Sequence, residues 1–351
     1  MNKDIYEIID KLKNTHSLTK EEYLVLIKGR NPDTTELLMK YANEERKKYY
    51  GKEVFLRGLI EVSNICKNDC YYCGIRKSNP NCQRYRLTPE DILMCCKEGY
   101  ELGFRTFVLQ GGEDGYFTDD ILCELIKNIK KDYPDCAVTL SLGERSKESY
   151  IKLKEAGADR YLLRHETADK NHYEILHPPS LSYDERMRCL KDLREVGFQV
   201  GCGFMVGSPG QTDEHIAGDL KFIEEFKPDM CGIGPFIPHK DTKFKDAKAG
   251  SVALTCYLLS IIRLIHPTVL LPATTALGTM DETGREKGIL SGANVVMPNL
   301  SPKEVRKKYM LYDNKLSDGA ESAQAKEELK RRIESIGYTI STSRGDVYKK
   351  D

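Results

Sequence analysis

Three closely spaced cysteines, Cys66, Cys70 and Cys73, are the residues of this sequence best suited to chemistry. Three thiolates within eight residues can each ligate one iron of a cubic iron–sulfur cluster, for which thiolates are the usual ligands. A structural cluster or zinc ion takes four protein ligands, so a set of three leaves one metal open to another molecule. The C-x3-C-x2-C spacing therefore predicts a catalytic cluster. A zinc knuckle, completed by Cys82 or a distant histidine, is the alternative.

Eight short apolar segments alternate with amphipathic helical patterns after residue 53. The expected strands span residues 54–62, 106–110, 137–141, 160–164, 199–206, 230–235, 269–272 and 293–297. A strand–helix alternation implies parallel strands joined by crossover helices. Eight such units predict an α/β fold, a complete (β/α)8 TIM-type barrel, and a doubly wound open sheet is the alternative. The cysteine triplet lies on the loop after the first strand.

The barrel pattern is flanked by helical patterns on both sides. Residues 1–50 form a predicted N-terminal helical extension, residues 51–312 the barrel, and residues 313–351 a polar, helical C-terminal cap. Ala323, Leu329 and Ile333 would be the apolar face of that cap. Thr19 and Glu22 have the spacing of a helix-starting capping box.

Composition narrows the class of protein. Lys and Arg together equal Asp and Glu, 54 of each, so a nucleic-acid partner is not expected. The first residues lack the apolar core of a leader peptide, and no run of eighteen apolar residues occurs, so we expect a cytoplasmic protein without a membrane span. Twelve cysteines in such a protein suggest reduced thiols and metal chemistry. The nine outside the triplet are expected to be mostly small buried hydrophobes.

Barrel enzymes place their chemistry at the carboxyl ends of the strands. The second expected strand ends in Gln110-Gly111-Gly112-Glu113, where glycines let a ligand approach the main chain. Ser141 ends the third strand, and Arg164-His165-Glu166 ends the fourth. Three consecutive ionisable residues are costly at a strand end unless each has a partner. Glu166 could accept ribose hydroxyls, Arg164 could hold an anion, and His165 alone is more often structural.

The triplet, with Tyr72 directly before its last cysteine and a barrel pattern behind it, resembles the radical S-adenosylmethionine (SAM) family. The resemblance implies that Cys66, Cys70 and Cys73 hold one 4Fe–4S cluster whose open iron binds SAM. A reduced electron donor would supply the electron that converts SAM into a 5′-deoxyadenosyl radical. It further implies that the segment Gln110, Gly111, Gly112 and Glu113 contacts the amino group of SAM.

Four further runs are similar to one branch of that family, the HydE maturases of FeFe hydrogenase. They are residues 161–167, 232–239, 272–276 and 292–299. The resemblance implies cofactor binding by Ser141, Glu166, Arg186 and Met205, and substrate or anion binding by Arg164, Thr274, Thr275 and Met297. It also implies an organometallic iron substrate bearing cysteine, whose sulfur the radical attacks, and other hydrogenase maturases as partners.

One departure from that branch concerns the tail. Some members carry a second cluster on three C-terminal cysteines, and residues 316–323 contain none, so one cluster is expected. Two other functions stay open. One is a related radical SAM mutase or sulfur-transfer enzyme of amino-acid or cofactor metabolism, such as a methylornithine synthase. The other is a non-catalytic zinc or iron–sulfur protein.

Overall fold

The computed structural model describes residues 4–317 and 319–348. Residues 1–3, which the expectation about a leader peptide includes, lie outside the described residues. So does Asp318, which belongs to the stretch without cysteines. The chain begins with three helices, α1 (Ile5–Thr15), α2 (Lys20–Lys28) and α3 (Pro32–Tyr50). The predicted capping box is confirmed, because Glu22 N–H donates to Thr19 Oγ1 at 3.2 Å and Thr19 N–H donates to Glu22 Oε2 at 2.9 Å.

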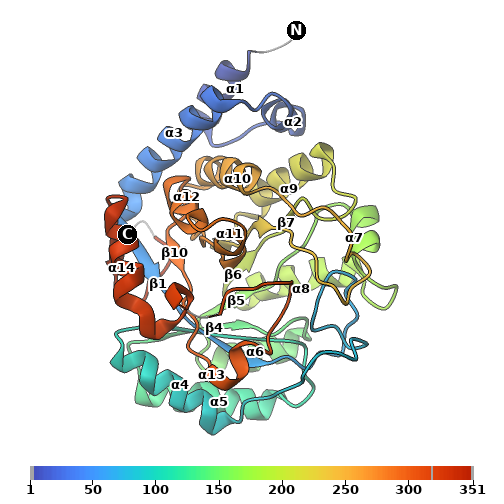
Figure 1. Cartoon of the computed structure of the whole chain (residues 1–351), viewed down its shortest axis with the longest axis vertical. Coiled ribbons are helices and arrows are strands. Elements are labelled where there is room, and N and C mark those ends of the chain that lie inside the picture. Colours follow the sequence, from blue (N-terminus) through green and yellow to red (C-terminus); the bar gives the residue numbers. More distant parts are fainter. Residues whose placement is uncertain (1–3, 318, 349–351) are drawn as a thin grey trace.

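Parallel strands form the centre of the molecule (Figure 1). Six of them pair side by side in sequence order, and β7 (Met205–Val206) is not among them. They are β2 (Gly58–Ser63), β3 (Thr106–Gly111), β4 (Ala137–Ser141), β5 (Arg160–Leu162), β6 (Gln199–Cys202) and β8 (Met230–Cys231). On the other side, β1 (Glu53–Leu56) pairs with β10 (Val295–Val296). Bridges from Met230 to Leu270 and from Pro272 to Val295 complete the ring. The sheet is therefore closed, which confirms the barrel and excludes the open sheet.

Three of the expected strands are divided. The segment 54–62 becomes β1 and β2, because the former pairs with β10 and the latter with β3. The segments 199–206 and 230–235 break after Cys202 and Cys231, and continue as β7 (Met205–Val206) and β9 (Gly234–Pro235). A Cβ at Gly203 would lie 2.0 Å from the carbonyl oxygen of Gly232, so close main-chain contact interrupts both strands there. The seventh expected strand, 269–272, exists only as the two bridges.

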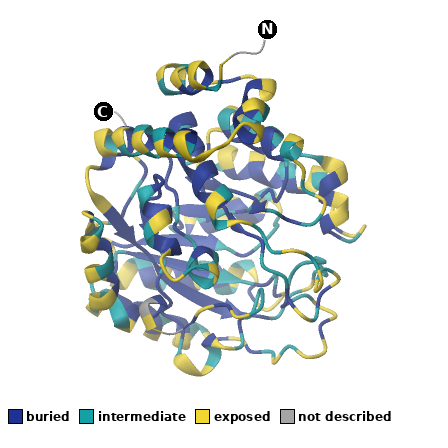
Figure 2. Cartoon of the chain, turned by 45° about the horizontal axis from the view of Figure 1, so that its top comes forward, coloured by how far each residue is buried: buried dark blue, intermediate teal, exposed yellow. Residues whose placement is uncertain are grey.

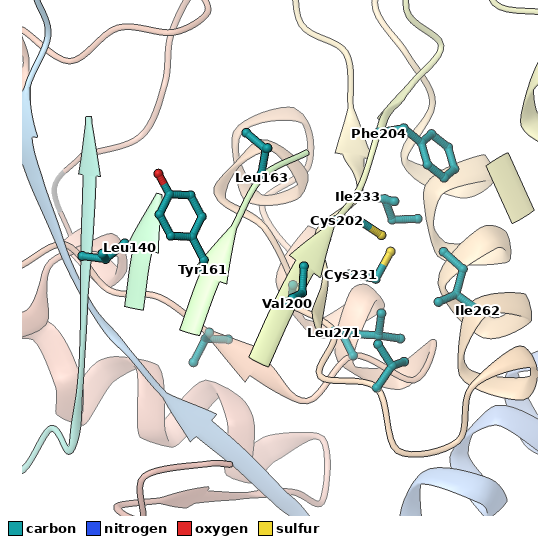
Figure 3. Close-up of a cluster of buried hydrophobic side chains, with 14 of the residues drawn as sticks. Leu140, Tyr161, Leu163, Val200, Cys202, Phe204, Cys231, Ile233, Ile262 and Leu271 are labelled. Carbon is teal, nitrogen blue, oxygen red and sulfur yellow. The ribbon is translucent and has the colours of Figure 1, made fainter. Parts of the chain in front are cut away.

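Helices surround the barrel and bury their inner faces against it (Figure 2). They are α4 (Pro89–Glu101), α5 (Asp119–Asp132), α6 (Lys147–Glu155), α7 (Lys170–Leu176), α8 (Tyr183–Val196), α9 (Asp213–Phe226), α10 (Val252–Ile265), α11 (Thr275–Met280), α12 (Gly284–Leu290) and α13 (Lys303–Arg306). Figure 3 shows part of the core, where Cys202 and Cys231 turn their sulfur atoms toward each other. Within the described residues, the helices are too short or too polar to cross a membrane.

The tail is more than the expected helical cap. It contains two 3-10 turns (Gly319–Glu321 and Ala323–Ala325), α14 (Lys326–Ser335) and a strand that the sequence did not predict, β11 (Thr339–Ser341). The β11 strand pairs in parallel with β1, because the amino-terminal end of β1 leaves its ladder groups free on that side. The next residues close the bottom of the barrel, where Asp346 pairs with the fully buried Arg160 at 2.5 Å.

Candidate active site

The three cysteines of the predicted cluster lie on the long loop between β2 and α4. Cys66, Cys70 and Cys73 are half-buried, and Cys73 N–H donates to the Cys70 carbonyl at 3.2 Å, which turns the loop. Burial raises the pKa of each thiol and neighbouring thiolates add to the effect at Cys70 and Cys73, so that the pKa of Cys73 is raised to about 12. Thiolates here need a cationic metal group, since coordination deprotonates a thiol outright. The donor set fits an iron–sulfur cluster.

The loop is not arranged around a single metal ion. In the part of the chain that the structure describes, no three Cys, His, Asp or Glu side chains converge as ligands of one ion. Cys82, the fourth ligand of the zinc alternative, instead accepts a 3.5 Å contact from Asn64 Nδ2. A cubic cluster takes one thiolate at each of several separate irons. Three thiols suit such a cluster, in which each would ligate a different iron.

The Gly112-Glu113 turn after β3 supports the cysteine loop from outside. Lys67 N–H donates to the Glu113 carbonyl at 3.0 Å. A Cβ at Gly112 would lie 2.3 Å from the carbonyl oxygen of Ile65 and 2.8 Å from Cβ of Cys66. Gly112 and Glu113 line an outer groove of about 230 Å³, in which Glu113 Oε2 lies 3.0 Å from Lys67 Nζ. Their predicted contact with SAM stays a prediction.

A cavity of about 330 Å³ occupies the barrel interior beside the cysteine loop. Tyr72 and Cys73 form part of its wall. Nine of the predicted site residues also line it: Gln110, Gly111, Ser141, Arg164, Glu166, Met205, Thr274, Thr275 and Met297. They lie at the carboxyl ends of barrel strands or just after them, where barrel enzymes build their sites. The fold thus brings predicted site residues from six sequence regions to one cavity.

Several polar atoms in this cavity wall have no hydrogen-bond partner among the described residues. Glu166 Oε2 lies 3.2 Å from Arg164 Nη2 without hydrogen-bond geometry, and Thr274 Oγ1 is also unpartnered. Glu166 adopts a left-handed backbone with φ 64°, which is uncommon for a residue with a side chain. Buried polar atoms are normally paired. These free atoms therefore indicate where a polar ligand would bind.

Arg186 and His165 have partners already. Arg186 Nε donates to Glu144 Oε1 at 2.6 Å and its Nη1 donates to the Arg164 carbonyl, so the guanidinium lies behind the cavity wall. The predicted contact of Arg186 with SAM stays a prediction. His165 Nδ1 accepts from Gly203 N–H at 3.2 Å and its Nε2 lies 3.3 Å from Asp219 Oδ1, which gives it a structural place between β5 and its neighbours.

Two charged residues of the cavity were not predicted. Glu61 of β2 is fully buried, and Lys315 reaches it from the tail with its Nζ 2.7 Å from Oε1. Glu61 Oε2 accepts from Asn299 Nδ2 at 2.8 Å. An acid among the apolar residues at the end of the expected strand 54–62 was a signal for Glu61. Nothing local in the sequence signals Lys315, because its position depends on the course of the tail.

Comparisons with known proteins agree with this geometry. The family model for the radical SAM superfamily matches residues 60–223. The chain is also 45% identical to the FeFe hydrogenase maturase subunit HydE of Thermotoga maritima, over 90% of this chain and 88% of that protein. This chain belongs to the HydE family of radical SAM enzymes.

Two solved structures share the fold of this chain. The crystal structure of methylornithine synthase (PylB) superimposes with a TM-score of 0.84 at 27% identity, covering 95% of this chain and 97% of that one. HydG, a maturase of the FeFe hydrogenase, gives a TM-score of 0.81 at 25% identity, covering 97% and 77%. The barrel is thus shared among enzymes whose names state different functions, and the cavity residues must set the substrate.

Proposed function

We propose that this HydE-family enzyme cleaves SAM at a 4Fe–4S cluster and uses the resulting radical in assembly of the FeFe hydrogenase active-site cluster. The observation that carries the proposal is that the loop bearing Cys66, Cys70 and Cys73 borders the cavity, with Tyr72 and Cys73 in the cavity wall. When bound, the cluster supplies one electron to the sulfonium of SAM, and carbon–sulfur cleavage gives a 5′-deoxyadenosyl radical.

The chain's own residues would bind, orient and shield these groups. Cys66, Cys70 and Cys73 would hold the cluster, and the main chain of Gln110 and Gly111 would approach SAM at the end of β3. The free oxygen of the Glu166 carboxylate is suited to accept hydrogen bonds from ribose hydroxyls. Ser141 and Met205 line the same cavity as this oxygen. Binding inside the barrel would limit the contact of a reactive carbon radical with water and stray hydrogen donors.

The substrate would occupy the side of the cavity formed by Arg164, Thr274, Thr275 and Met297. Arg164 and the Thr274 hydroxyl offer donors, and these donors suit an anionic substrate such as an iron–carbonyl–cyanide complex of cysteine. Attack of the radical on the cysteine sulfur would form a carbon–sulfur bond while the iron–sulfur bond breaks, and the iron unit, reduced by one electron, would pass toward the diiron centre. We infer a partner maturase as the source of this complex and a cytoplasmic reductant as the source of the electron.

A mutase acting on an amino acid is the second candidate, because PylB shares the fold at a TM-score of 0.84. Mixing the reconstituted enzyme with lysine and SAM separates the two. Mass spectrometry would detect methylornithine for the mutase, whereas the maturase would give an adenosylated cysteine product only when the iron–cysteine complex is supplied. Formation of methylornithine would contradict the maturase proposal.

Anaerobic reconstitution tests the chemistry itself. We expect about four irons per chain and 5′-deoxyadenosine on reduction with dithionite. Cys70→Ser should abolish 5′-deoxyadenosine formation, because the cluster loses one of three ligands. Cys82→Ser is the matched control, since Cys82 lies on the same loop outside the triplet and should retain activity. Retained SAM cleavage in Cys70→Ser would contradict the ligand assignment.

A further inference from the structure

Charge is distributed unevenly over a chain that is neutral as a whole. Three segments, 66–84, 239–249 and 307–314, together carry ten Lys or Arg and four Asp or Glu. The first is the cysteine loop, the second follows β9, and the third belongs to the tail. They are far apart in sequence, so the local excess of positive charge is produced by the fold.

Hydrogen bonds join these three segments into one surface around the cluster loop, here called the basic face (Figure 1). Arg76 Nη2 donates to the Asp241 carbonyl at 3.0 Å. Gly74 N–H donates to the Leu311 carbonyl at 2.9 Å. Lys240 N–H donates to Asp313 Oδ2 at 2.9 Å, which ties the second segment to the third.

The basic face exposes more ammonium groups than carboxylates. Lys77, Lys240 and Lys243 are exposed. Lys243 Nζ lies 4.2 Å from the ring centre of Tyr71, which stands next to Cys70. Of the acids on this face, Asp69 accepts from Ser78 Oγ at 2.6 Å. Two of the other acids also accept hydrogen bonds, Asp241 from Asn81 Nδ2 and Asp313 from Lys240 N–H. The fourth, Asp246, is exposed.

We propose that the basic face is the docking surface for a small acidic iron–sulfur electron carrier. The inference rests on the proposed function, in which the cluster takes up one electron at a time. The carrier's reduced cluster would lose one electron, the enzyme's cluster would gain it, and no proton or bond would change. An iron–sulfur carrier delivers single electrons at low potential. Complementary charge accelerates and orients such encounters, and the three half-buried cysteines belong to the first segment of this face.

The test compares protein-mediated reduction with reduction by a small molecule that does not dock. The variant Lys77→Glu/Lys240→Glu/Lys243→Glu reverses three charges on the basic face. The matched control, Lys47→Glu/Lys127→Glu/Lys131→Glu, reverses three exposed charges on α3 and α5. The probe is a reduced plant-type 2Fe–2S ferredoxin, and the readout is the initial rate of 5′-deoxyadenosine formation at low and high salt.

We expect the basic-face variant to lose at least about tenfold in ferredoxin-driven rate at low salt, with the deficit shrinking as salt screens the charges. Dithionite-driven cleavage, iron content and the control variant should match the wild type. An equal loss in the control, or a loss insensitive to salt, would overturn the proposal. So would a defect seen only with an acidic flavin carrier. Failure of dithionite-driven cleavage in the wild type would instead refute the proposed function.

Discussion

Lys315 and Glu61 form an ion pair inside the barrel, with Nζ and Oε1 2.7 Å apart and both side chains almost fully buried. Glu61 belongs to the first barrel strand and Lys315 to the tail, 254 residues later. The pair therefore holds the tail at Lys315 against β2 in the cavity wall. Asn299 Nδ2 donates to the second oxygen of Glu61 at 2.8 Å, which completes the partners of the carboxylate.

Replacing Lys315 by Met should destabilise the protein, because Glu61 would remain buried without its counter-ion. Breaking a buried ion pair from one side costs about 3–5 kcal/mol. Differential scanning calorimetry should show the lower melting temperature. The double variant Lys315→Met/Glu61→Gln should recover much of the loss, whereas Lys330→Met, at an exposed helix position, should change little. Equal melting of the single variant and the wild type would show that the pair is energetically neutral.

Replacing Gly112 by Ala should lower the amount of cluster that the protein holds. The new Cβ would lie 2.3 Å from the carbonyl oxygen of Ile65, so the cysteine loop must shift. Gly115→Ala is a matched control three residues later, because its Cβ would meet no atom within 4 Å. Iron content and the cluster absorption of the reconstituted proteins measure the difference. Full iron loading of Gly112→Ala would show that the loop tolerates the displacement.

Replacing Glu166 by Gln should weaken SAM binding while the cluster remains. The change removes the charge of a carboxylate whose free oxygen faces the cavity. A hydrogen bond to a charged group contributes about 1.5–3 kcal/mol, so we expect the dissociation constant for SAM to rise roughly 10- to 100-fold. Equilibrium dialysis with labelled SAM provides the measurement, and Glu174→Gln on the exposed side of α7 is the control. Unchanged affinity in Glu166→Gln would remove Glu166 from the SAM site.

Buried His177 should make the protein sensitive to acid. Its Nδ1 lies 2.9 Å from the Tyr173 carbonyl, and burial, assisted by the charge of Arg186, lowers the pKa of His177 to about 3. The unfolded chain takes up this proton near pH 6.5, whereas the folded chain does not until about pH 3. The stabilising contribution is therefore complete above pH 6.5 and is lost as the pH falls from 6.5 toward 3.

His177→Asn should flatten this part of the curve of unfolding free energy against pH. Each pH unit in the window is worth at most about 1.4 kcal/mol for one group. Some slope will remain, because burial also lowers the pKa of His266, to about 4. Denaturant titrations at several pH values give the curve. Parallel curves for the wild type and the variant would mean that His177 has the same pKa in the folded and the unfolded chain.

The sequence predicted much of the barrel because its signals are local. Alternating apolar runs and helix starts such as Thr19, which accepts from Glu22 N–H at 3.2 Å, marked the elements in order. Local sequence patterns did not predict strand breaks or strand pairing that depend on a distant segment. Gly203 and Gly232 break two strands through close contact with each other, and β11 forms because β1 offers a free edge. In each case the residues around one segment do not indicate which distant segment it will contact.

The sequence by itself determined the chemistry available here: three thiolates, the strand-end glycines and the Arg164-His165-Glu166 run. Only the tertiary structure decided which of these groups line the cavity and which are paired with other side chains. Ring closure placed Glu166 and Thr274 in one cavity, put Gly112 and Glu113 outside it, paired Arg186 with Glu144, and brought Lys315 to Glu61. Residue types are carried by the chain, whereas burial and partners depend on contacts between distant segments, which form when the barrel closes.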